Sequence, residues 1–65
     1  MIPKHARQLV NLRQVDMAKK LKIHLVTYSR LENEPGRYTI YQARLFCEIV
    51  GRTLEEIFGE SSGTL

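Results

Sequence analysis

The chain has 65 residues, enough for one small domain, and its single cysteine, Cys47, excludes an intramolecular disulfide, which favours a reducing, cytoplasmic location. No run approaches the ~18 apolar residues that a membrane-spanning helix needs, and the start of the chain lacks an apolar signal core, so we expect neither membrane insertion nor export. The net charge of +3 is unevenly divided: residues 1–33 have seven Lys or Arg against two acidic residues (+5), and residues 34–65 have three against five (−2). A positive half of this kind favours a polyanionic partner such as nucleic acid.

The first predicted helix is short. Pro3 suits a first helical turn, and Ala6, Leu9 and Val10 then share one face. Asn11 is a plausible left-handed residue at its end.

A second helix is expected from about residue 14 to 21, because apolar or small residues recur there at helical spacing. Arg13 stands where a Ser or Thr cap would be usual, which predicts a poorly capped start. Ala18 is small enough for two helices to cross closely. The turn that follows needs a positive φ at Lys22, a position where Gly is usual.

The third helix is expected to start near residue 24 or 25 and to end near 32 or 33, with Tyr28 and Leu31 facing inward. Two short helices joined by a tight turn over residues 14–33 form a helix-turn-helix pattern. The residues left on the outward face are Leu25, Val26, Ser29 and Arg30, with Thr27 at the margin.

After a loop over residues 33–39, a fourth helix is expected over about 40–50 and a fifth from Thr53, whose capping box uses Glu56. The fourth helix is predicted to bury Ile40, Ala43, Phe46, Cys47 and Val50, and the fifth to close the core with Leu54, Ile57 and Phe58. The domain is therefore expected over residues 1–58, with a frayed tail over 59–65.

The spacing of several features together resembles the Cro/repressor-type helix-turn-helix family (lambda-repressor-like, XRE) over about residues 3–58. The features are Gln14 at the start of the second helix, Ala18 at the crossing, Ser29-Arg30-Leu31-Glu32-Asn33 at the end of the third helix, and Gly51 followed by Thr53-Leu54-Glu55-Glu56-Ile57-Phe58. The resemblance implies a compact all-α fold of five helices that binds operator DNA, usually as a dimer.

By that resemblance, the third helix would read bases. Arg30 would pair with guanine, and Ser29 would donate or accept a hydrogen bond. Leu25 and Val26 would pack on thymine methyl groups. The residues implied to contact phosphate are Gln14, Asn33 and Arg37, with Lys22 and Tyr41 as second-rank candidates. Arg7 and Glu32 fall where the family has a buried, structural ion pair.

The sequence departs from the family pattern at three places. His24, Leu25 and Val26 replace a commonly polar run, Lys22 replaces Gly, and Arg52 stands where an apolar residue is usual. The operator sequence therefore does not follow from the resemblance.

Some residues keep an alternative interpretation. Leu25 and Val26 fit a protein-contact patch almost as well as a base contact, and Arg30 fits a solvated charge or an ion pair with Glu34. His5, His24 and Cys47 lack ligand spacing, so we expect no metal, and no cofactor or small-molecule substrate is indicated. No paired carboxylates, activated nucleophile or phosphate loop suggests an enzyme.

The sequence thus predicts a cytoplasmic, sequence-specific regulator that binds double-stranded DNA as a homodimer, in the manner of phage, mobile-element or antitoxin repressors. The alternative is a protein-interaction module on the same fold, with Leu25 and Val26 as its contact surface.

Overall fold

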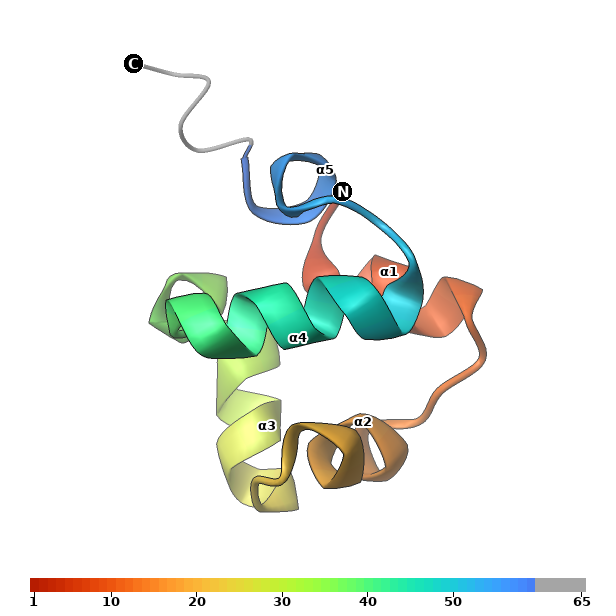
Figure 1. Ribbon diagram of the computed structural model, residues 1–65. Helices are drawn as coiled ribbons and strands as arrows, with labels where there is room; N and C mark the ends of the chain where they lie inside the picture. Colours follow the sequence, from red (N-terminus) through yellow and green to blue (C-terminus); the bar gives the residue numbers. More distant parts are fainter. Residues whose placement is uncertain (60–65) are drawn as a thin grey trace.

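The computed structural model describes residues 1–59, and this part of the chain consists of helices and the short segments that connect them (Figure 1). The elements are α1 (Pro3–Leu9), α2 (Gln14–Leu21), α3 (Leu25–Asn33), the 3-10 turn η1 (Pro35–Arg37), α4 (Ile40–Val50) and α5 (Leu54–Phe58). The expected all-α, five-helix fold class is confirmed. The tail predicted over 59–65 lies outside the described residues except for Gly59.

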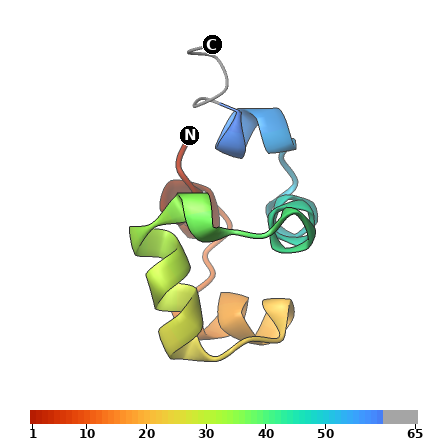
Figure 2. The same ribbon diagram turned by 90° about the vertical axis from the view of Figure 1, so that its left-hand side faces the viewer.

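The helices surround one core, with α2 and the start of α3 at one end of the molecule and α5 at the other (Figures 1 and 2). α2 packs chiefly on α3, and α4 packs chiefly on α5. The start of α3 and the α5 end therefore belong to opposite ends of a small body.

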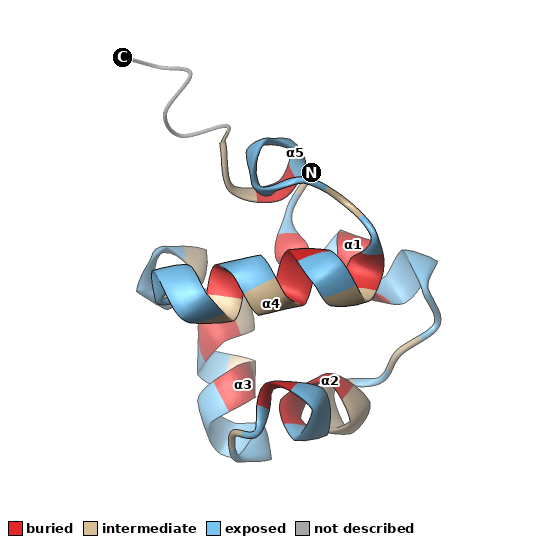
Figure 3. Cartoon of the chain, viewed as in Figure 1, coloured by how far each residue is buried: buried red, intermediate tan, exposed pale blue. Residues whose placement is uncertain are grey.

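Three large side chains, Met17, Tyr28 and Phe46, are almost completely buried and come from α2, α3 and α4. Figure 3 shows that each of these helices has buried positions. Ala18 is 2% exposed, as expected of a close helix crossing. Phe46 also meets the rings of Tyr38 and Phe58 edge to face, at centroid distances of 5.6 and 6.2 Å. These contacts join the helix-turn-helix to α4 and α5.

The predicted helix ends are present. Asn11, Lys22 and Gly51 have φ angles of 59°, 60° and 72°, so each takes the left-handed conformation that ends a helix. Thr39 and Thr53 accept hydrogen bonds from the backbone three residues later and so cap α4 and α5.

The start of α2 has no side chain that accepts hydrogen bonds from the first-turn amides, as predicted with Arg13 at this position, but Asp16 forms the other half of a capping box. Its carboxylate accepts hydrogen bonds from the Arg13 backbone N–H and guanidinium, each at 3.0 Å. The hydrogen bond from the guanidinium has the larger effect and that from the backbone the next largest, and together they lower the pKa of Asp16 to about 2.

Two apolar residues that were predicted to lie inward, Ile40 and Leu54, are exposed instead, and so are Leu9 and Val10, which were predicted to share a face with Ala6. Leu9 and Val10, at the end of α1, are 60% and 38% exposed, and Ile40 and Leu54, at the starts of α4 and α5, are 69% and 36% exposed. All four lie in terminal turns, or just beyond one, where the neighbouring helices do not extend far enough to cover them. The buried residues of α1 are Pro3, Ala6 and Arg7.

Candidate nucleic-acid interface

The outward face of α3 carries the side chains that the sequence assigned to base reading. Leu25 and Val26 are 45% and 66% exposed, Arg30 is exposed, and Ser29 is partly exposed. These four positions lie within one side of the helix, while Tyr28 and Leu31 hold the opposite side in the core. α3 is thus fixed by its inner face and open along its outer face.

Arg30 makes no side-chain hydrogen bond or ion pair within residues 1–59. The alternative pairing with Glu34 is not present; Glu34 Oε1 instead accepts from Arg37 Nε at 2.5 Å. Arg30 is therefore available to an external acceptor.

The carboxylate of Glu32, on the inner side of α3, joins three helices. Oε2 accepts from Arg7 Nε of α1 at 2.5 Å and from the Tyr28 hydroxyl at 2.7 Å, while Oε1 accepts from Gln14 Nε2 of α2 at 2.8 Å. Arg7 also donates to the Leu12 carbonyl at 2.6 Å. The ion pair that the resemblance implied is present, with side chains only 8% and 3% exposed.

The electrostatics of this cluster favour the charged pair. Burial by itself would raise the pKa of Glu32, but the hydrogen bonds from Arg7, Gln14 and Tyr28 outweigh it and hold that pKa below its usual value. Burial would lower the pKa of Arg7, yet its hydrogen bond to Glu32 leaves the pKa raised. Burial raises the pKa of the Tyr28 hydroxyl, and its hydrogen bonds with Tyr38 and Glu32 raise it further, so the hydroxyl stays protonated as a donor.

The bond between Gln14 and Glu32 was not predicted from the sequence. The two residues are 18 positions apart, and no local spacing pattern signals such a contact. It orients the Gln14 side chain beside the start of α2, using one of its two amide N–H groups. The second N–H and the backbone amides of the first turn remain for an anion.

Beyond the end of α3, Arg30, Asn33, Glu34 and Arg37 surround a shallow depression of about 260 Å³. The structure therefore brings together three residues with predicted DNA contacts: Arg30 on α3, Asn33 at the last position of α3, and Arg37 in η1. Tyr41, 73% exposed in the first turn of α4, does not line this depression.

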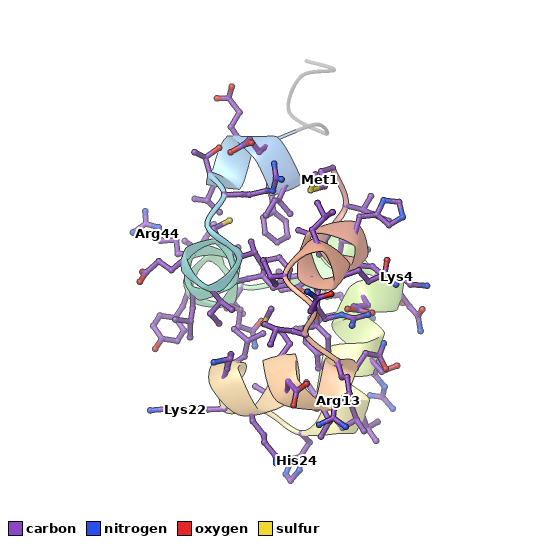
Figure 4. The ribbon with its side chains drawn as sticks, turned by 90° about the vertical axis from the view of Figure 1, so that its right-hand side faces the viewer. Met1, Lys4, Arg13, Lys22, His24 and Arg44 are labelled. Atoms are coloured by element: carbon purple, nitrogen blue, oxygen red, sulfur yellow. The ribbon has the colours of Figure 1, made fainter. Side chains whose placement is uncertain are left out.

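The turn between α2 and α3 is cationic and exposed. Lys22 and His24 project outward from it, at the end of the molecule where Arg13 also lies (Figure 4). Lys22 has the left-handed backbone that the sequence predicted. This turn adds positive charge beside the outer face of α3.

Two other kinds of site find no support in the part of the chain that the structure describes. Within residues 1–59, no three His, Cys, Asp or Glu side chains are grouped so that they could hold a metal ion. None of the described helices has the length and apolar character needed to cross a bilayer.

In comparison with protein families, residues 4–57 match the model of a helix-turn-helix family. Neither the curated proteins nor the solved structures gave a match to the chain. The matched segment contains α2 to α4 and all but one residue each of α1 and α5, so it includes the outer face of α3 and the Glu32 cluster. The chain belongs to the Cro/C1-type (XRE) helix-turn-helix family of DNA-binding regulators.

Proposed function

We propose that the protein is a cytoplasmic repressor, of the phage, mobile-element or antitoxin type, that binds a two-fold symmetric operator as a homodimer. In this proposal α3 enters the major groove, and the two half-sites lie about 34 Å apart on one face of the duplex. The observation that carries the proposal is the outer face of α3, where Arg30 has no side-chain partner within the described residues and Leu25 and Val26 are exposed.

The residues around α3 support distinct roles. Arg30 pairs with guanine, Ser29 adds a hydrogen bond, and Leu25 and Val26 pack against thymine methyl groups. The contacts to phosphate, which set the register without reading sequence, are made by Gln14, Asn33 and Arg37, with Lys22 and Tyr41 in support.

Selection from random duplex DNA, followed by anisotropy titration, tests the proposal. On the selected operator, Arg30→Ala should weaken binding by about 1–3 kcal/mol, because it removes a paired base contact. Binding to unrelated DNA should change much less. Arg44→Ala is the matched control, since Arg44 is an exposed arginine on α4. Uniform weak binding, with no sequence enriched by selection, would contradict base reading.

The exposure of Leu25 and Val26 also favours a second candidate, a module that binds another protein through α3. Leu25→Asp separates the two functions, because it places a negative charge on the proposed reading face. DNA affinity that this substitution leaves unchanged, together with loss of a co-purified partner, would favour the protein-binding module.

A further inference from the structure

The first turn of α3 presents two adjacent aliphatic side chains to the outside. Leu25 and Val26 are 45% and 66% exposed, and they begin the helix at the end of the molecule from which Lys22 and His24 project (Figure 4). The opposite side of α3 is buried in the core, so the helix cannot turn to cover them. Adjacent apolar side chains held outward beside cationic ones mark a contact surface for a polyanion that also carries apolar groups.

Leucine and valine side chains have neither a hydrogen-bond donor nor an acceptor, so they can recognise a base pair only through an apolar group. In the major groove, the prominent apolar group is the C5 methyl group of a pyrimidine. Thymine always carries this methyl group, and cytosine carries it at the same ring position once it is 5-methylcytosine. Leu25 and Val26 therefore suit a methyl group and not one particular base.

We propose that Leu25 and Val26 recognise the C5 methyl group of 5-methylcytosine as well as that of thymine, so that cytosine methylation of the DNA strengthens binding. The proposal rests on the entry of α3 into the major groove, which is part of the proposed function. In that groove, thymine presents an O4 acceptor where cytosine presents an N4 donor. Neither aliphatic side chain forms a hydrogen bond with these groups, so the two methylated bases are equivalent to this pair of side chains.

Arg30 adds a guanine to the expected sequence context. Val26 and Arg30 are four residues apart, so they lie on the same side of α3, about 6 Å apart along its axis. Successive nucleotides of one strand are about 3.4 Å apart along the duplex. When α3 lies along the groove, the methyl group at Val26 and the guanine at Arg30 therefore fall within about two base pairs of each other. A methylated CG step supplies both groups in adjacent base pairs.

The expected size of the effect follows from the burial of one methyl group. Such burial contributes ~0.8 kcal/mol, which corresponds to about a fourfold change in affinity. Contributions from separate positions are roughly additive in free energy, so methylation of two equivalent half-sites should strengthen binding about sixteenfold. The guanine contact of Arg30 is the same in both forms of the DNA. Methylation therefore adjusts the occupancy of a site that the protein already binds.

Anisotropy titrations of the whole chain on modified duplexes test the proposal. In the operator obtained by selection, each thymine of one half-site is replaced in turn by deoxyuridine, which removes the C5 methyl group and leaves the base pair otherwise unchanged. Affinity should fall about fourfold at the contacted position. The same position is then tested as cytosine and as 5-methylcytosine. The methylated duplex should bind about fourfold more tightly than the unmethylated one, so the methyl group has the same effect in both base pairs.

The chain offers a matched control for the two side chains. Leu9 and Val10, at the end of α1, are a second adjacent leucine and valine that are both exposed, and they lie outside α3. The double variant Leu25→Ser/Val26→Ser should bind the methylated and unmethylated duplexes within about 1.5-fold of each other. Leu9→Ser/Val10→Ser should keep the fourfold difference. Serine is small, polar and uncharged, and circular dichroism confirms that each variant is folded.

Three results would overturn the proposal. The first is a methyl effect below about 1.5-fold at every thymine of the half-site. The second is an equal methyl effect in the two double variants. The third is a protein partner that the Leu25/Val26 variant loses while its DNA affinity stays that of the wild type, because those side chains would then contact protein.

Failure of this proposal is distinguishable from failure of the proposed function. Sequence-specific binding that depends on Arg30 but ignores every methyl group would overturn the methyl contact and support the regulator. Uniform weak binding, with no sequence enriched by selection, would contradict the regulator and the methyl contact together.

Discussion

The carboxylate of Glu32 accepts hydrogen bonds from one side chain of each of the first three helices, Arg7, Gln14 and Tyr28. A buried ion pair is weak evidence for stability, because desolvation offsets its attraction, but removing one partner leaves a charge without compensation. At the scale of single residues, the position of α3 therefore depends on a polar contact as well as on apolar packing.

Glu32→Gln tests this dependence. The substitution keeps the shape of the side chain and leaves the Arg7 guanidinium buried without its counter-charge, so we expect a loss of about 3–5 kcal/mol in the free energy of unfolding, measured by urea denaturation. Glu34→Gln is the control, because it removes the exposed partner of Arg37 and should change stability by less than about 1 kcal/mol. Similar losses in the two variants would contradict a special role for the buried pair.

Stability should also fall in acid. The pKa values of Asp16, Glu32 and Glu56 are lower in the folded protein than their usual values, and that of Asp16 is about 2. The unfolded chain therefore takes up protons first, so stabilisation that is present above about pH 5 is lost as the pH falls through the folded values. Urea midpoints between pH 6 and pH 2 should decrease, and Asp16→Asn should make the decrease shallower. An unchanged slope in that variant would refute the contribution of Asp16.

At the scale of elements, the turn between α2 and α3 stores local strain. Lys22 has a φ of 60°, a conformation that is unfavourable for a residue with a Cβ atom. The same residue presents an exposed cation beside α3. Under the proposed function, stability and DNA affinity would therefore make opposite demands on this position.

Lys22→Gly should separate the two demands. Release of the strained backbone should raise the free energy of unfolding by up to about 1 kcal/mol, while loss of the cation should weaken DNA binding and reduce its salt dependence. Lys20→Gly removes the same charge from the last turn of α2, where the backbone is helical, and should instead destabilise the protein by up to about 1 kcal/mol. Equal destabilisation by both substitutions would show that no strain is present at Lys22.

The helices and their ends could be predicted from the sequence because they depend on local chemistry. Thr39, Thr53 and Gly51 act within a few residues of their own position, and the apolar spacing of α2 and α3 identifies their inner faces. Spacing gives the direction of a side chain but not whether another helix covers it. Ile40 and Leu54 were therefore wrongly placed in the core.

In the candidate site, too, the features set by local spacing could be predicted, and those set by contacts between helices could not. The outer face of α3 follows from its periodicity, so the exposure of Arg30 and Val26 could be predicted. The bond from Gln14 to Glu32 depends on how α2 crosses α3, which no local pattern specifies. The Arg7–Glu32 pair was suggested by resemblance alone, because 25 residues separate its members.

At the scale of the whole molecule, the positive charge lies in the half of the chain that contains the proposed DNA-binding helices. The half that contains α2 and α3 carries +5, and the half that contains α4 and α5 carries −2. DNA binding through the positive half should release counterions, so affinity should fall steeply with salt.

Arg37 and Arg52 allow a matched test of that expectation. Each is paired with a glutamate three or four residues away, but only Arg37 borders the depression with Arg30 and Asn33. In titrations at several salt concentrations, Arg37→Ala should reduce the slope of log affinity against log salt by about 0.9 per half-site, and Arg52→Ala should leave it unchanged. The same slope for both variants would remove Arg37 from the phosphate contacts.

The Glu32 cluster also bears on the shape of the operator. α3 cannot tilt away from α1 and α2 without separating a buried ion pair, so the protein should dock as a rigid body. Any mismatch between its curvature and that of straight duplex must then be accommodated by bending or twisting of the DNA. Base pairs that the protein never touches, such as those between the two half-sites, should therefore influence affinity through their stiffness.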